Sequence, residues 1–288
     1  MKEILIILAC VPLYVCNAMC DKLVSATIEN KYSAVYNCIK FTLCSICVIP
    51  MLLIGNAQAL GMGSLLCGLV CSLLYAVSKT VVLKGYAATS VAFMTLCHSA
   101  GMILPCVLGH FLWEEKLSLL ALVGIVVTVG AIGLLKDDGD TKAKIHAKGI
   151  LYGSITFLTS AGVMLTQKCM GIYFADESIG LYNLISFAGA ALILSSRIKT
   201  VQIRNDNPKA GRTVGFCALG SAVSLSVISF VMTSLASGVP SFILFPLFNG
   251  MGIILVCIVS AVVFKERLTA KKIISLIAGI LGLYMINI

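Results

Sequence analysis

The sequence predicts an all-α polytopic membrane protein with ten transmembrane helices, arranged as two inverted-topology five-helix repeats. Three observations lead to this prediction. The 288 residues are 59% hydrophobic and only 11% charged, whereas soluble domains carry about 25% charged residues. The apolar residues come in blocks of about 20, which is the helical length that crosses a bilayer core. Finally, the second half of the chain repeats the first half.

Each apolar block is an expected helix, because a backbone in lipid must satisfy its own polar groups. The connections between blocks are mostly short, and none is polar and long enough to fold as a separate domain. The expected spans are, in order, residues 4–20, 33–55, 62–83, 88–112, 117–135, 149–168, 178–195, 213–235, 239–264 and 268–287.

The repeat appears when the chain is shifted against itself. A shift of 151 residues lays Thr95–Ser118 over Pro246–Thr269 without a gap. A shift of 146 residues lays "YNCIKF", which begins at Tyr36, over "YNLISF", which begins at Tyr182. Each half has five spans, and because five is odd the second half enters the membrane from the opposite face. Many secondary transporters have such inverted repeats, with a substrate site between them near the midplane.

The duplication also defines the expected domain organisation. We expect one membrane domain with a basic linker between its halves. The first five-helix repeat covers residues 1–136, the linker covers residues 137–148 and the second five-helix repeat covers residues 149–288.

Two short elements occur at equivalent places in the two halves. "EEKLS" at Glu114–Ser118 joins spans four and five, and "KERLT" at Lys265–Thr269 joins spans nine and ten. With the ten spans and the duplication, they make the chain resemble the drug/metabolite transporter superfamily, specifically its EamA-type transporters, over essentially its whole length. The resemblance implies a central cavity lined mainly by spans three, four, eight and nine, with spans five and ten at the periphery. It implies no particular substrate, since the family carries amino acids, purine-like metabolites, sugars and cations.

Several other kinds of site are not expected. Nearly all of the thirteen cysteines fall inside apolar spans, where a thiol behaves as a small hydrophobe. His98 and His110 are about 18 Å apart along one helix, which is too far to share a metal. The sequence therefore predicts no enzyme activity, no metal, no cofactor and no nucleic-acid partner. The expected partners are a small-molecule substrate and the lipid bilayer, and a homodimer is left open.

The basic residues indicate an orientation. The face that carries the termini has three lysines, and the opposite face has sixteen lysines and arginines. The positive-inside rule then places the basic loops 137–148 and 196–212 in the cytoplasm and both termini outside. The family resemblance implies cytoplasmic termini instead, so the orientation stays open. In both cases we expect an integral protein of the plasma (cell inner) membrane.

Three groups that can carry positive charge are expected at similar depths. Lys40 lies about 10 Å into the second span, and Lys79 and His98 approach a similar depth from the same face. A charge near the bilayer centre costs about 2.5–3.5 kcal/mol and usually faces the bundle interior. All twelve carboxylates, Asp21 among them, are expected at span ends or in loops. The lysines then snorkel to the headgroups, become neutral, hydrogen-bond to Tyr and Asn side chains, or meet an anion of the substrate.

The repeat shows where the two halves differ. Lys79 aligns with Phe230, His98 aligns with Asn249, and Lys40 aligns with a serine. A cavity that grips an asymmetric solute must itself be asymmetric, so these mismatches indicate the binding site. The expected contacts are Lys79 and His98, with Asn249 as an opposing hydrogen-bond group, Tyr75 and Phe230 as walls, and Lys40 as a weaker member.

The expected function is a secondary transporter or permease that moves a small polar metabolite by alternating access. The cationic groups favour an anionic or zwitterionic solute, such as an amino acid or an organic acid. The same fold also suits an exporter of cationic or neutral drug-like metabolites or sugars, or a non-transporting receptor or assembly subunit. Coupling is open as well: His98, with an unperturbed pKa near neutrality, is the candidate if protons are carried, and a facilitator is equally allowed.

Overall fold

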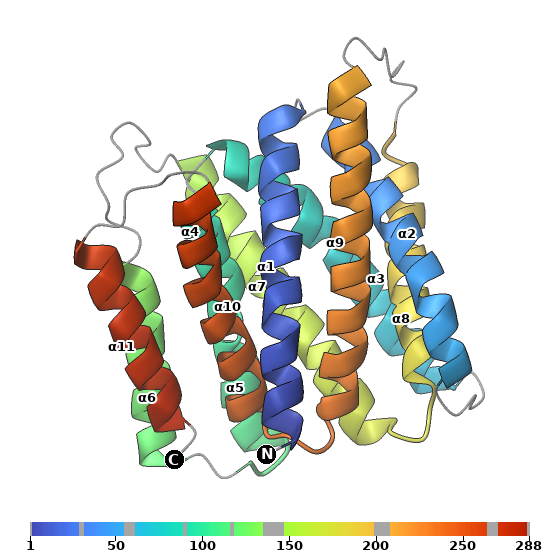
Figure 1. Ribbon diagram of the computed structural model, residues 1–288. Helices are drawn as coiled ribbons and strands as arrows, with labels where there is room; N and C mark the ends of the chain where they lie inside the picture. The colour runs from blue at the N-terminus through green and yellow to red at the C-terminus, as the bar shows by residue number, and fades with distance from the viewer. Residues whose placement is uncertain are drawn as a thin grey trace.

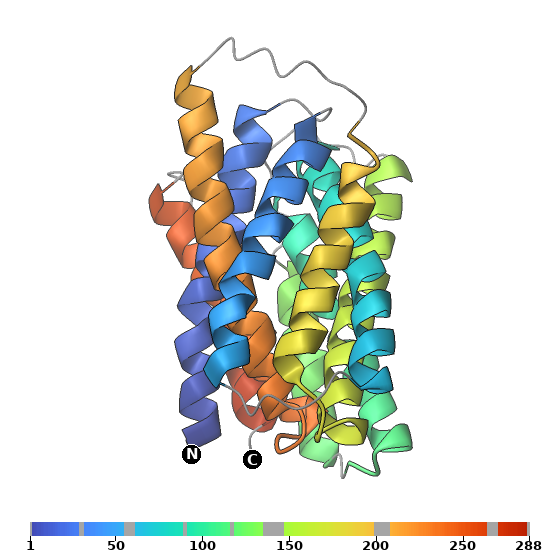
Figure 2. The ribbon, with the colours of Figure 1, turned by 90° about the vertical axis from the view of Figure 1, so that its right-hand side faces the viewer.

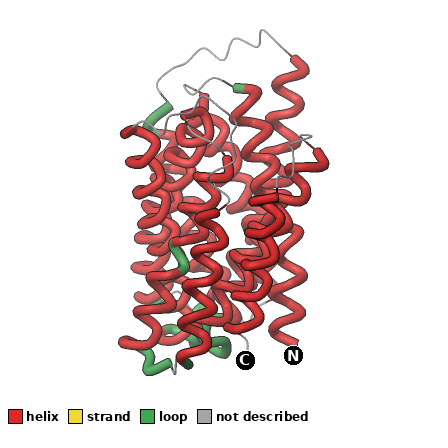
Figure 3. The backbone as a smooth tube through the Cα atoms, turned by 90° about the vertical axis from the view of Figure 1, so that its left-hand side faces the viewer, coloured by secondary structure: helices red, strands yellow, loops and turns green. Residues whose placement is uncertain are grey.

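The computed structural model describes residues 2–28, 32–54, 61–88, 91–115, 118–134, 147–198, 208–263 and 270–286. These residues form eleven α-helices and no strands (Figure 3). The helices are α1 (Lys2–Thr27), α2 (Ser33–Ile54), α3 (Met62–Ala88), α4 (Val91–Ala100), α5 (Ile103–Leu112), α6 (Leu119–Leu134), α7 (Ala147–Tyr173), α8 (Ile179–Ser195), α9 (Pro208–Leu235), α10 (Ser241–Val263) and α11 (Ala270–Ile286).

The helices have the length and composition of membrane spans. Within the described residues, five of them are long and apolar enough to cross a bilayer: α1, α2, α3, α7 and α9. Shorter apolar stretches accompany them, including Leu119–Ala131 of α6, Ile179–Ser195 of α8 and Ser241–Val256 of α10. Large apolar side chains such as Leu119 and Phe216 are exposed on the outside of the bundle, where a lipid-facing surface is expected. The chain is an integral membrane protein.

The long helices stand side by side along one axis, with both chain ends at the same end of the bundle (Figures 1 and 2). We call this end the terminal face and the other end the basic face. The described residues include little of the basic loops 137–148 and 196–212, so the predicted orientation of these loops is not tested by the structure.

Helices α6 and α11 pack on each other at one edge of the bundle (Figure 1). The contact is close because Gly282 has no side chain: a Cβ there would lie 2.8 Å from the carbonyl oxygen of Gly124. Small residues at helix interfaces allow such approach in membranes. This is the peripheral position that the family resemblance implies for spans five and ten.

The remaining helices pack in pairs that correspond between the halves. Helix α1 packs on α9 and α10, while α7 packs on α3 and α4. Helix α2 packs on α8 and α9, while α8 packs on α2 and α3. Side chains of α1, α3, α4, α7, α9 and α10 face the centre of the bundle, so helices of both halves surround it.

The span predicted at 88–112 is not one helix, because it is broken between α4 and α5 at Gly101 and Met102. The break lies against α7: a Cβ on Gly101 would collide with Ser160 Oγ and lie 2.9 Å from the Phe157 carbonyl oxygen. Ser160 Oγ instead donates a hydrogen bond to the His98 carbonyl oxygen at 2.5 Å. A neighbouring helix thus satisfies a carbonyl at the break, which is how broken helices are tolerated at membrane depth.

Candidate substrate-binding site

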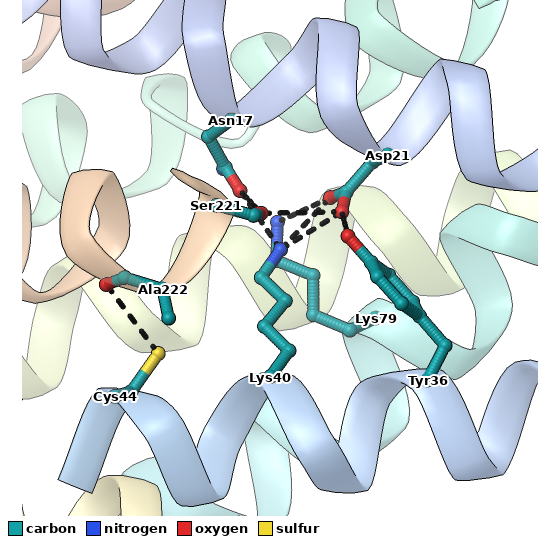
Figure 4. Close-up of polar contacts among 8 residues, drawn as sticks. All are labelled: Asn17, Asp21, Tyr36, Lys40, Cys44, Lys79, Ser221 and Ala222. Atoms are coloured by element: carbon teal, nitrogen blue, oxygen red, sulfur yellow. Dashed lines mark hydrogen bonds and ion pairs between the residues drawn. The ribbon is translucent and has the colours of Figure 1, made fainter. Parts of the chain in front are cut away.

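A buried carboxylate joins the first three helices (Figure 4). Asp21 on α1 accepts hydrogen bonds from Lys40 Nζ at 2.9 and 3.1 Å and from Tyr36 Oη at 2.8 Å. Lys79 Nζ on α3 lies 3.7 Å from Asp21 Oδ2. Lys40 Nζ also donates to Asn17 Oδ1 at 2.8 Å. The side chains of Lys40 and Asp21 are only 0% and 4% exposed, so this network lies inside the bundle.

The prediction that every carboxylate lies at a span end or in a loop is wrong for Asp21. The apolar block ends at residue 20, where charged residues follow, but α1 continues to Thr27. The helix can continue past Asp21 because its backbone hydrogen bonds do not depend on side-chain polarity. The carboxylate can be buried because two ammonium groups compensate its charge. Snorkelling is also wrong for Lys40 and Lys79, because both ammonium groups lie at Asp21 inside the bundle.

The two lysines are not equally satisfied. Lys40 Nζ makes hydrogen bonds to both Asp21 oxygens and to Asn17. Lys79 Nζ has a longer contact with the same carboxylate. One carboxylate therefore compensates two ammonium groups, and Lys79 is the more weakly held.

Lys79 lies on the wall of a cavity at the centre of the bundle, whose empty volume of about 630 Å³ includes space that is open to the outside. Helices of both halves line this central cavity. Its lining residues are Tyr14, Asn17, Tyr75, Ser78, Lys79, His98, Ser160, Val163, Met164, Gln167, Leu225, Ile228, Met232, Phe245, Phe248 and Asn249.

Four of the predicted site residues meet at this cavity: Lys79, His98, Asn249 and Tyr75. The other two do not lie in its described lining. Lys40 is behind the wall, bound to Asp21, and α9 contributes Ile228 and Met232 to the wall rather than Phe230. Whether any of the six binds substrate stays a prediction.

Polar groups on the cavity wall differ in how well they are paired. Asn249 Nδ2 donates to the Phe245 carbonyl oxygen of its own helix at 2.9 Å. Gln167 Nε2 donates to Ser229 Oγ at 3.3 Å. His98 Nδ1 is buried and has no hydrogen-bond partner. Because an unpaired buried nitrogen costs free energy, His98 is suited to take a partner from a bound molecule.

The prediction did not include Asp21 or Gln167, although the sequence contains a signal for both. The shift of 146 residues that aligns Tyr36 with Tyr182 also aligns Asp21 with Gln167. A polar residue at the same helical position in both halves, so close to a span end, indicates a buried polar position. That signal shows where the two residues lie, but it does not show that Asp21 is the partner of two lysines.

A second buried ion pair lies on the terminal face. Glu115, which follows α5, is 2.9 Å from Lys168 Nζ through its Oε1. Ser241 is the first residue of α10, and its amide donates a hydrogen bond to Glu115 Oε2 at 2.8 Å. Lys168 Nζ also donates to the Val239 carbonyl oxygen at 2.8 Å. A carboxylate from the first half thus caps a helix of the second half and is held there by a buried lysine.

A carboxylate of the second half also caps a helix of the first half. Glu177, between α7 and α8, accepts hydrogen bonds from the Gly63 and Ser64 amides in the first turn of α3. Partial burial raises the pKa of the Glu177 carboxyl, but the donating amides outweigh it and hold that pKa below its usual value. Carboxylates are favourable at helix N-termini. Contacts of this kind therefore cross between the halves in both directions on the terminal face.

Comparison with known proteins adds one family. Residues 182–278 match the family model of the Small Multidrug Resistance protein. This segment runs from α8 into α11 and covers about a third of the chain. Together with the membrane-spanning helices, the match indicates a membrane transporter of small molecules.

Comparison of structures shows a shared fold. A solved structure described as "Crystal structure of protein" superimposes with a TM-score of 0.73 at 15% sequence identity. The match covers 99% of this chain and 96% of that chain. A search of curated proteins finds no match.

Proposed function

We propose that this chain is a secondary transporter that moves a small polar metabolite, anionic or zwitterionic, across the membrane by alternating access. The observation that carries this proposal is the central cavity, which lies between the two halves and has Lys79 and the unpaired His98 Nδ1 on its wall. A cavity at the repeat interface is where secondary transporters bind their substrates.

The proposed architecture is the EamA type, with α4 and α5 together forming one of ten spans and the two halves forming inverted repeats. The helix pairings support it: α1 of the first half packs on α9 of the second, and α7 of the second half packs on α3 of the first in the same way. The location of both termini on one face also supports an even number of spans (Figure 1).

Alternating access requires contacts that close one face and can be released. The carboxylate caps made by Glu115 and Glu177 on the terminal face are such contacts, because each joins the two halves. We propose that they hold this face closed and separate when the cavity opens toward it. The halves then rock about the cavity, as in other inverted-repeat transporters.

The proposed substrate contacts are Lys79 and His98, with Asn249 opposite and Tyr75 as part of the wall. Lys40 and Phe230 belong to the proposal less directly, since neither lies in the described cavity lining. The excess positive charge at Asp21 favours an anionic or zwitterionic solute. The proposed location is the plasma membrane, and a homodimer stays a prediction.

The family match favours one alternative. The match to the Small Multidrug Resistance family is compatible with an exporter of drug-like molecules, and cationic ones are among the alternatives that the sequence leaves open. The residues that line the described cavity include lysine and histidine but no carboxylate, and a buried cation needs an opposite charge. Neutral drug-like solutes or sugars remain compatible with this cavity. A non-transporting receptor could have the same cavity.

Flux into proteoliposomes tests the proposal. Purified protein is reconstituted and uptake is measured for radiolabelled amino acids, organic acids, sugars and quaternary amines. A Ser78→Trp variant fills the cavity, and Leu73→Trp places the same side chain on the exposed surface of α3. We expect uptake of an anionic or zwitterionic solute by the parent and by Leu73→Trp, and its loss in Ser78→Trp.

Two results would contradict the proposal. Uptake no faster than in protein-free liposomes for every class would favour a non-transporting receptor. Uptake of quaternary amines alone would favour the cation exporter.

A further inference from the structure

We propose that the central cavity binds a small monocarboxylate with an apolar tail, its carboxylate on Lys79 and its tail toward the terminal face. This inference rests on the proposed function and narrows its substrate class. It follows from the charge at Asp21, the sequence of the second half, the mainly apolar wall near the terminal face and the absence of carboxylates from the described lining of the cavity.

The charge at the cavity wall is suited to one negative group. Two ammonium groups share one carboxylate, which leaves one positive charge uncompensated. Lys40 is held by three hydrogen bonds behind the wall, whereas Lys79 lines the cavity at 3.7 Å from Asp21. A ligand carboxylate that binds Lys79 would make the site neutral while Asp21 stays paired with Lys40. A dianion would leave one negative charge buried without a partner, which is costly.

The second half shows that the fold does not need this charge. The positions that align with Asp21, Lys40 and Lys79 are Gln167, Ser186 and Phe230, all of them neutral. Ser186 Oγ is satisfied by a carbonyl of its own helix at 2.7 Å, and Gln167 by Ser229. Buried ionic groups can often be replaced by neutral ones without loss of stability. The charged network in the first half is therefore best explained by a charge on the ligand.

Two large apolar side chains, Met232 and Phe245, line the cavity near the terminal face. Met232 lies three residues before the end of α9, and Phe245 lies four residues after the start of α10. Both are within about 6 Å of those helix ends. The turn between these helices is at the terminal face, since a Cβ on Gly238 would lie 3.8 Å from Glu3 Oε1 near the N-terminus.

The positive groups lie farther from the terminal face. Lys79 is nine residues before the end of α3, and His98 is seven residues after the start of α4. Those helix ends lie at the basic face, at depths of about 14 and 10 Å from the two side chains. The two positive groups thus lie nearer the basic face, whereas the wall nearer the terminal face is mainly apolar, and the amide of Gln167 there is already paired with Ser229. Ligand sites of this kind bury an apolar body and fix its orientation with a few polar groups.

The described lining of the cavity has no negative partner for an ammonium group. The residues that line the described cavity include no aspartate or glutamate, and Lys79 repels a second cation. An α-amino acid would have to bury its ammonium against neutral oxygens only. A simple carboxylic acid avoids this cost, so we infer that the acid binds more tightly than the amino acid with the same tail.

A matched ligand series tests the inference by isothermal titration calorimetry in nanodiscs. The probes are 3-phenylpropanoate, 3-phenylpropanol, 2-phenylethylamine, L-phenylalanine and acetate. We expect 3-phenylpropanoate to bind most tightly, with acetate at least about tenfold weaker because its tail buries little apolar area. Tightest binding by the amine or the alcohol, or equal binding of the acid and L-phenylalanine, would overturn the inference.

Two lysine variants then locate the carboxylate. Lys79→Gln keeps a donor but loses the charge, and we expect it to weaken 3-phenylpropanoate binding about 10- to 100-fold. Lys84→Gln removes a charge from an exposed position on the same helix and should bind as the parent does. Equal binding by Lys79→Gln and the parent would overturn the inference.

The results also separate this inference from the proposed function. If Lys79→Gln does not fold, the ligand series on the parent decides alone. Failure of the acid to bind together with flux of another solute overturns only the ligand class. Binding of the acid without any flux overturns the transporter proposal instead.

Discussion

Replacing Asp21 by asparagine should destabilise the protein more than most single substitutions. Asp21→Asn preserves the shape of the side chain but removes the charge that faces both lysines. At an effective dielectric constant of about 20, an ion pair at the 2.9 Å of Lys40 contributes about 6 kcal/mol of Coulomb energy. Desolvation offsets part of this energy, and measured losses for removing one partner of a buried pair are about 3–5 kcal/mol.

A double-mutant cycle separates the charge from other effects. Lys40→Met should cost less than Asp21→Asn, because Asp21 then keeps Lys79 and Tyr36 as partners. The double variant Asp21→Asn/Lys40→Met removes one charge of each sign, so we expect it to recover part of the stability lost in Asp21→Asn. The free energy of unfolding is measured by denaturant titration in detergent, with circular dichroism as the readout.

Two results would refute this reasoning. Asp21→Asn could unfold at the same denaturant concentration as the parent, which would mean that the carboxylate does not compensate the lysines. Alternatively, the double variant could lose the sum of the two single losses, which would mean that Asp21 and Lys40 do not interact.

Three further predictions concern the closing contacts and the helix break. Glu115→Gln leaves Lys168 without its carboxylate, so the first turn of α10 should exchange amide hydrogens faster by mass spectrometry, whereas Glu114→Gln at the exposed neighbouring position should not change it; equal exchange in both variants would contradict the contact. The pKa of Glu177 is lowered in the folded state. The stabilisation by its carboxylate is therefore fully present above the unfolded pKa, about 4.3, and is lost as the pH falls through the lower folded pKa. The stability difference between parent and Glu177→Gln should therefore be constant from pH 7 to about 5.5 and shrink below about 4, and a difference that grows on acidification would oppose this. Gly101→Ala should lose about 1–3 kcal/mol by overpacking against α7, while Gly130→Ala, where nothing lies within 4 Å, should be nearly neutral in the same unfolding assay.

The helices could be predicted from the sequence because apolar block length is a direct consequence of bilayer thickness. The block at 178–195 differs by one residue from α8 at its start, and the block at 33–55 differs by one residue from α2 at its end. The break after Ala100 could not be predicted in this way. It depends on the contact of Gly101 with α7, and hydropathy contains no information about which helix lies opposite.

The site could be predicted in part. Lys79 and His98 stand out because a charged or polar group within an apolar block needs a reason to be there. The sequence predicts Asp21 at a span end, because it follows the apolar block at 4–20, and only the fold shows that it faces inward. Which cations share this carboxylate depends on the packing of α1, α2 and α3, which no spacing along the chain reveals.

The central claim is that the cavity moves an anionic solute that binds Lys79, and solid-supported membrane electrophysiology tests it most directly. Proteoliposomes are exposed to a concentration jump of 3-phenylpropanoate. The neutral form of the acid crosses lipid without moving charge, so a current reports the protein alone, and binding of the anion to Lys79 displaces charge within the protein even where a proton travels with it. The account predicts a transient current for the parent and for Lys84→Gln and its loss in Lys79→Gln. A current no larger than that of protein-free vesicles, or an undiminished current in Lys79→Gln, would contradict it.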